Sequence, residues 1–183
     1  MTEAKAVSPP RAFLDFCARH PEECRARNDA PARVQLTSER MDQLFEVQRS
    51  VNLAVSYRPD SYTFGELDFW EFPFVYGDCE DYALKKKRDL IALGWPRSGL
   101  LLTVVRVAGG GLHMVLSVPT DIGDIVLDNR MSGLALWSAL DYRWLTRQSR
   151  YDESRWVKLA VSGAADFGRE RGIGLDGTVS LGD

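Results

Sequence analysis

The chain has 183 residues, of which 45% are hydrophobic, and this is about the length of one domain with a substantial core. Its formal net charge of −3 provides no general attraction to nucleic acid, so we expect no nucleic-acid partner. No run approaches the ~18 apolar residues that a membrane span needs, so we also expect no transmembrane helix.

Residues 1–31 combine prolines and charged residues with one short apolar run at 13–16, and they predict an arm lying on the domain. Residues 1–6 lack the apolar stretch of a secretory signal, so either the protein is cytoplasmic or a signal was removed before this sequence begins.

The arm carries two of the three cysteines, Cys17 and Cys24. Either they form a short-range disulfide, as in an oxidising compartment, or both remain reduced and partly buried. A third alternative is a metal site made with His20, although this spacing matches no recognised zinc motif. The spacing alone does not decide between these alternatives.

The next segment predicts a helix followed by a loop. After an N-cap at Thr37 or Ser38, apolar residues recur at helical spacing up to Val55, which indicates an amphipathic helix. Residues 56–76 are rich in aromatic side chains but are interrupted by proline and glycine. We expect an ordered loop that covers the following helix.

A second helix is predicted from Cys79 to Leu93, where glycine and then proline supply a stop signal. Strand patterns follow at 100–107, 112–118 and 124–128, and residues 156–161 predict a last strand. Between them, Trp137, Tyr142 and Trp144 are expected to pack on the sheet.

This order of elements predicts an α+β fold in which N-terminal helices pack on an antiparallel β-sheet meander. We expect residues 1–162 to form one domain. The polar, glycine-rich residues 163–183 have little to bury, so they predict a flexible tail.

Cys79 is the candidate nucleophile because it stands at the start of a helix. Free backbone N–H groups and the positive end of the helix dipole stabilise a thiolate there. His113 and Asp128 follow on two strand segments. If these strands are neighbours, the carboxylate can orient the imidazole while the other ring nitrogen faces the sulfur.

Each of these residues also has a structural explanation. A cysteine at a helix start is often a small buried filler, and a histidine in a strand is often a satisfied core or edge residue. An aspartate at a strand end commonly opens a turn. The joint order of Cys79, His113 and Asp128 is what favours catalysis.

Three blocks in this order resemble the bacterial transglutaminase-like cysteine proteinases, together with Trp70 and the Cys17–Cys24 segment, over about residues 9–160. The blocks are Gly77-Asp78-Cys79-Glu80-Asp81-Tyr82-Ala83, Leu112-His113-Met114-Val115-Leu116 and Val126-Leu127-Asp128-Asn129. The resemblance implies a transglutaminase-like variant of the papain fold. It also implies that Cys79, His113 and Asp128 form a catalytic triad.

The same resemblance implies a setting for the activity. Characterised members are calcium-dependent periplasmic proteases that release large biofilm adhesins from the outer membrane. An inner-membrane receptor for cyclic di-GMP controls them. The resemblance therefore implies a protein substrate such as a large adhesin, this type of receptor as a partner, and a periplasmic location.

Acidic residues surround the candidate nucleophile. Asp78, Glu80 and Asp81 would raise the pKa of a neighbouring thiol by like-charge repulsion. They either cap the helix and complement its dipole, or Asp78 and Glu80 hold a calcium ion, as the family resemblance favours. The basic run at 85–88 wraps around a helix, so we expect it to form a solvated face rather than a polyanion site.

The sequence thus predicts a cysteine endopeptidase that works through an acyl-thioester. The same triad could transfer the acyl group to an amine, as a transglutaminase or amidase does. A non-catalytic module that binds protein in its groove is the third alternative.

Overall fold

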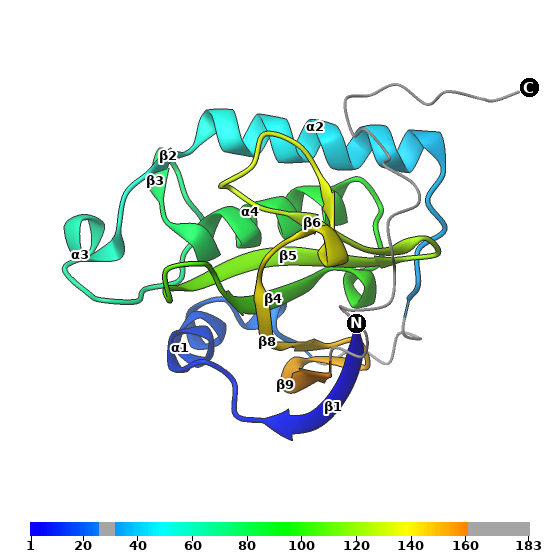
Figure 1. The fold of residues 1–183 in the computed structure, drawn as a ribbon. Coiled ribbons are helices and arrows are strands. Elements are labelled where there is room, and N and C mark those ends of the chain that lie inside the picture. The colour runs from blue at the N-terminus through cyan, green and yellow to red at the C-terminus, as the bar shows by residue number, and fades with distance from the viewer. Residues whose placement is uncertain (26–31, 161–183) are drawn as a thin grey trace, which may run out of the picture.

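The computed structural model describes residues 1–25 and 32–160 and shows one twisted sheet with helices on it (Figure 1). The predicted tail at 163–183 and the predicted domain boundary at 162 lie outside the described residues. The α+β class is confirmed, because helices pack on a sheet whose seven strands pair antiparallel.

The strand order in the main sheet is β1-β9-β8-β4-β5-β6-β7. Its strands are β1 (Thr2–Val7), β4 (Leu101–Arg106), β5 (Leu112–Thr120), β6 (Gly123–Leu127), β7 (Ala135–Leu136), β8 (Arg143–Ser149) and β9 (Asp152–Ala160). Strands β4 to β6 form the predicted meander, and β7, which was not predicted, pairs with β6. The chain then returns to the other side of β4, where β8 and β9 extend the sheet.

The helices lie in layers on one side of this sheet. They are α1 (Arg11–Arg19), α2 (Ser38–Ala54), the short α3 (Asp60–Thr63) and α4 (Cys79–Ala92), with 3-10 turns η1 (Pro21–Glu23) and η2 (Arg97–Gly99). A third 3-10 turn, η3 (Trp137–Ala139), lies on the opposite face of the sheet. Helix α4 packs on β4 and β5, and α2 packs on α4 (Figure 1). A two-stranded parallel ribbon, β2 (Ser56–Tyr57) with β3 (Tyr76–Gly77), leads into α4.

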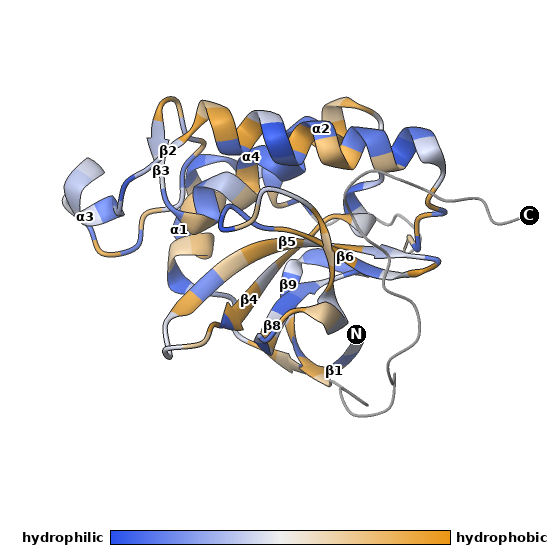
Figure 2. Ribbon diagram, turned by 45° about the horizontal axis from the view of Figure 1, so that its top comes forward, coloured by the Kyte–Doolittle hydropathy of each residue, from blue (hydrophilic) through white to orange (hydrophobic). Residues whose placement is uncertain are grey.

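Both predicted helices are confirmed, and their residues explain why. Thr37 is the N-cap of α2, since its hydroxyl accepts the N–H of Arg40 at 3.3 Å. The buried Leu44, Val47 and Val51 of α2 lie on one helical face. In Figure 2, α2 alternates hydrophobic and hydrophilic bands, whereas β4, β5 and β6 carry long hydrophobic stretches.

The hydrophobic core is divided between the two faces of the sheet. On β5, Met114, Leu116 and Val118 belong to the cluster that also contains the buried side chains of α1, α2 and α4. The intervening Val115 belongs to a second cluster with Val105, Val126 and Trp144, against which the side chains of Trp137 and Tyr142 pack. The alternation follows from the two-residue period of a strand, and it confirms that these rings pack on the sheet.

Two expectations about charged or irregular segments are wrong. The predicted N-terminal arm forms part of the fold: β1 pairs with β9, and Phe13 and Phe16 of α1 lie in the core. The basic run on α4 is not a solvated face, because Lys86 and Lys87 are buried where the helix is covered by α2 and the sheet.

None of the helices in the described ranges is both long enough and apolar enough to cross a membrane.

Candidate active site

The start of α4 positions the candidate nucleophile. Asp78 is the N-cap, and it forms a capping box with Asp81, in which the N–H of Asp78 donates to Oδ2 of Asp81 at 3.3 Å. Gly77 makes room for this box, since a Cβ there would lie 2.8 Å from the Cβ and from Oδ2 of Asp81. Cys79 is therefore held in the first turn, beside free backbone N–H groups.

The Cys79 thiol lies between the acids and strand β5. Its Sγ donates a hydrogen bond to Oε2 of Glu80 at 3.1 Å. Burial, and then the charge of Glu80, raises the pKa of the thiol, while a hydrogen bond from the backbone N–H of Met114 lowers it. Helix α4 packs on β5, the strand that carries His113, but no hydrogen bond joins Cys79 to His113 in this structure.

His113 and Asp128 meet, as the sequence predicts. Leu116 pairs with Leu127 in the antiparallel register of β5 and β6, so Asp128, directly after β6, stands diagonally across from His113. Nε2 of His113 lies 2.8 Å from Oδ1 of Asp128, and both side chains are buried.

Asp128 accepts two further hydrogen bonds, from the backbone N–H of Arg130 at 2.8 Å and from the hydroxyl of Tyr142 at 2.6 Å. Burial alone raises the pKa of Asp128, but these bonds and the His113 contact hold it below its ordinary value. An ionised carboxylate only accepts, so Nε2 of His113 carries the proton and Nδ1 is left free to take one.

Three carboxyl groups form a cluster at the start of α4. Oxygen atoms of Asp60, Asp78 and Glu80 all lie within 4.8 Å of one another. Asp78 and Glu80 are the metal ligands predicted from the sequence, whereas Asp60, the first residue of α3, was missed. It comes from a segment 18 residues before Asp78, and no motif in the sequence links the two.

This cluster carries more negative charge than its surroundings neutralise. Burial raises the pKa of Asp60 to about 6, and burial with a hydrogen bond to Asp78 raises that of Glu80 to about 10. Oδ1 of Asp60 and Oδ1 of Asp78 are buried without a hydrogen-bond partner. Oxygen ligands with unused acceptor capacity match the coordination chemistry of calcium, so these residues fit that ion.

The loop that contains Phe69, Trp70 and Glu71 closes over the acids. The backbone N–H of Phe69 donates to Asp60, and that of Glu71 donates to Oδ1 of Asp81 at 2.9 Å. Trp70 is buried in the core, which fixes the middle of the loop. The loop is therefore bound to the carboxyl groups of Asp60 and Asp81.

The C-terminal end of helix α1 contacts the same loop through Arg19 and His20. Arg19 donates to the carbonyl of Trp70 at 2.6 Å and lies 4.0 Å from the centre of the Phe69 ring. His20 contacts Glu71 with Nε2 2.8 Å from Oε1. Hydrogen bonds from His20 and from the Phe72 N–H outweigh the effect of burial and lower the pKa of Glu71.

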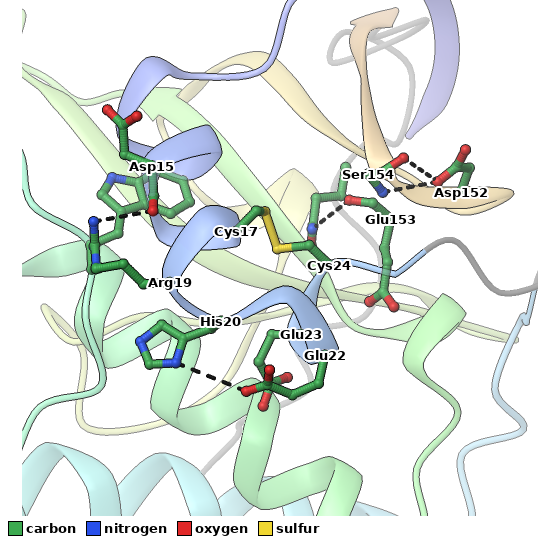
Figure 3. Close-up of a disulfide and its surroundings, with 12 residues drawn as sticks. Asp15, Cys17, Arg19, His20, Glu22, Glu23, Cys24, Asp152, Glu153 and Ser154 are labelled. Carbon is green, nitrogen blue, oxygen red and sulfur yellow. Dashed lines mark hydrogen bonds and ion pairs between the residues drawn. A yellow bond between two sulfur atoms is a disulfide. The ribbon is translucent and has the colours of Figure 1, made fainter.

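Arg19 and His20 lie between the two half-cystines of a disulfide (Figure 3). Cys17 and Cys24 are bridged, with their Cα atoms 5.5 Å apart. The disulfide alternative is therefore confirmed, and the alternative metal site of Cys17, His20 and Cys24 is wrong. Cys79 remains as the free cysteine.

The fold is that of a transglutaminase-like cysteine proteinase. The family model of the bacterial transglutaminase-like cysteine proteinases matches residues 3–164, so the chain belongs to this family, and its class is that of the cysteine proteases.

Among solved structures, the chain is similar to LapG of Legionella pneumophila. The calcium-bound form matches with 28% identity and a TM-score of 0.56, over 68% of this chain and 72% of that chain. The EGTA-treated form matches with 31% identity and a TM-score of 0.51, over 58% of this chain and 61% of that one. The matched region is thus less than two thirds of the EGTA-treated chain. No curated protein matches significantly.

Proposed function

We propose that the protein is a calcium-dependent cysteine endopeptidase with Cys79 as nucleophile, His113 as general base and acid, and Asp128 as the residue that orients His113. The observation that carries this proposal is the buried His113–Asp128 pair, 2.8 Å apart, with His113 on the strand β5 against which the helix that begins at Cys79 packs. Membership of the cysteine proteinase family supports the same assignment.

The chemistry follows from the free Nδ1 of His113. This nitrogen takes the thiol proton as the sulfur attacks the peptide carbonyl carbon, and the carbonyl oxygen becomes an oxyanion near the backbone N–H of Cys79. When the C–N bond breaks, His113 returns the proton to the departing amine. Water then attacks the thioester and gives a proton to His113. As the C–S bond breaks, His113 passes this proton to the departing sulfur, which releases the carboxylic acid and restores the thiol.

The thiol must leave Glu80 before it can pair with His113. Its hydrogen bond to Glu80 and the surrounding carboxylates oppose ionisation of the sulfur. Asp60, Asp78 and Glu80 would hold the calcium ion, which supplies the positive charge that neutralises these groups. The calcium-bound LapG structure among the neighbours supports this choice of ion.

Substrate and location are proposed on the family resemblance. The substrate is a large bacterial surface adhesin, the controlling partner is an inner-membrane receptor for cyclic di-GMP, and the site of action is the periplasm. The Cys17–Cys24 disulfide supports the periplasm, because disulfides persist in oxidising compartments.

New N-termini provide the direct test. The protein is incubated with a bacterial outer-membrane protein fraction and calcium chloride, and the N-termini are labelled and identified by mass spectrometry. We expect new termini in one or a few proteins, and none with Cys79→Ala or with EGTA. A glutamine-donor protein and a labelled primary amine are tested in parallel. Amine incorporation without cleavage would replace the protease by an acyl transferase, and neither product would favour a binding module.

A further inference from the structure

Hydrogen bonds from helix α2 hold the main chain of Asp128 in place. The buried amide of Gln48 on α2 donates to the carbonyl oxygens of Asp128, Met131 and Gly133 at 2.7, 2.8 and 3.0 Å. Asn52, one turn later, donates to the carbonyls of Asp128 and Met131 at 3.3 and 2.9 Å. Since α2 holds this turn at several points, the remaining freedom of Asp128 lies in its side-chain torsions.

Those torsions are set by hydrogen bonds on the two carboxylate oxygens. Oδ1 accepts from Arg130 N–H and from His113, whereas Oδ2 accepts from the hydroxyl of Tyr142 at 2.6 Å. Tyr142 therefore donates a hydrogen bond to the carboxylate oxygen that does not contact His113. A carboxylate with partners on both oxygens has one preferred orientation, and this orientation aims Oδ1 at the imidazole.

Tyr142 is itself held in place, and it stays a donor. It lies between η3 and β8, and its ring centre is 6.0 Å from that of Trp144 and 6.3 Å from that of His113. Burial, and then the hydrogen bond to Asp128, raises the pKa of Tyr142, so the hydroxyl keeps its proton. The sequence predicts that this ring packs on the sheet, but no sequence motif links it to the site.

We propose that Tyr142 is a positioning residue of the active site: its hydroxyl holds the Asp128 carboxylate so that His113 presents Nδ1 toward Cys79. The inference rests on the proposed triad. It adds a fourth member that acts through Asp128 and does not touch the substrate.

The test is the rate at which iodoacetamide alkylates Cys79, measured by intact mass in calcium chloride. The chain has three cysteines and two are bridged, so the reagent reports Cys79 alone. Tyr142→Phe should lower the rate about tenfold, the effect of losing one hydrogen bond to a charged group. The matched control is Tyr82→Phe, which loses a buried hydroxyl bonded to the carbonyl of Val55 and should keep the wild-type rate.

Two further measurements separate positioning from general damage. In an Asp128→Asn background, Tyr142→Phe should cause no additional loss, because both changes act through one carboxylate. The proton resonance of His113 Nε2–H should also shift in Tyr142→Phe and remain in place in Tyr82→Phe. A wild-type rate and an unshifted resonance in Tyr142→Phe, with Asp128→Asn slow, would overturn the role of Tyr142 alone. A wild-type rate in Asp128→Asn would overturn the triad and this inference with it.

Discussion

Two buried charged clusters pack against α4, and they differ in how their charges are balanced. At the start of the helix, Asp60, Asp78 and Glu80 form no ion pair with a described lysine or arginine, and two of their buried oxygens have no hydrogen-bond partner. Further along, Lys87 donates to Glu153 at 3.2 Å, and Arg97 lies 3.0 Å from Glu153 and 2.9 Å from Glu23.

The comparison shows how a structural and a functional cluster can be told apart. The second cluster pairs two cations with two anions, so its charges are satisfied within the protein. The first cluster is satisfied only if it takes up protons or a cation. An unbalanced set of buried carboxyl groups beside the candidate nucleophile is typical of a site that binds an ion.

The largest effect is expected where a satisfied cluster is broken. Glu153→Ala removes the anion that the buried Lys87 and the half-buried Arg97 share, which should cost about 3–5 kcal/mol of unfolding free energy. Urea unfolding measures it. The matched control is Arg155→Ala, which removes an exposed pair with Asp152 and should cost at most about 1 kcal/mol. If both variants lose the same small amount of unfolding free energy, the second cluster does not stabilise the fold.

The next effect concerns the acid that the sequence did not reveal. Asp60→Asn removes one of the three carboxylates, so calcium affinity should fall about a hundredfold, or ~2.7 kcal/mol. Isothermal titration calorimetry with calcium chloride measures this loss. Glu66→Gln makes the same charge change on a nearby exposed residue and should leave the affinity unchanged. Unaltered binding in Asp60→Asn would remove Asp60 from the ion site.

A smaller loss is expected at the disulfide that flanks Arg19 and His20. Replacing both Cys17 and Cys24 with serine should lower the unfolding free energy by about 2 kcal/mol, the value for a short closed loop. Thermal unfolding in calcium chloride and in EGTA measures it. Because α1 holds the loop over the acids, we expect weaker calcium binding as well. Unchanged stability would show that the bridge does not support the site.

The last prediction is a pH dependence of the calcium-free protein. The pKa values of Asp60, Asp81 and Glu80 are raised to about 6, 8 and 10, so the folded state binds protons more tightly than the unfolded state. In EGTA, the free energy of unfolding should therefore fall as the pH rises from about 5 to about 8, because the folded state loses its extra protons over this range. Calcium should flatten this slope. Stability that rises with pH in EGTA would contradict the raised values.

The sequence predicted the parts of the site that depend on local pattern. Cys79 follows from the helix-start motif, and His113 and Asp128 follow from the two-residue period of neighbouring strands. Asp60 and Tyr142 could not be found in this way, because they reach the site through loops whose paths are set by tertiary contacts.

The wrong predictions about the fold also concern residues whose positions are set by tertiary contacts. Strand β1 could not be predicted because Thr2 pairs with Ala160, near the other end of the described chain. Lys86 and Lys87 were assigned to solvent because helical periodicity does not reveal that α4 is covered on both sides.

The central claim is that His113 activates Cys79, and one rate comparison tests it most directly. In calcium chloride at neutral pH, iodoacetamide should alkylate the wild-type protein about a hundredfold faster than His113→Ala, because the thiolate is stabilised by the imidazolium. Equal rates for the two proteins would show that the cysteine and the histidine do not act together, and would contradict the account.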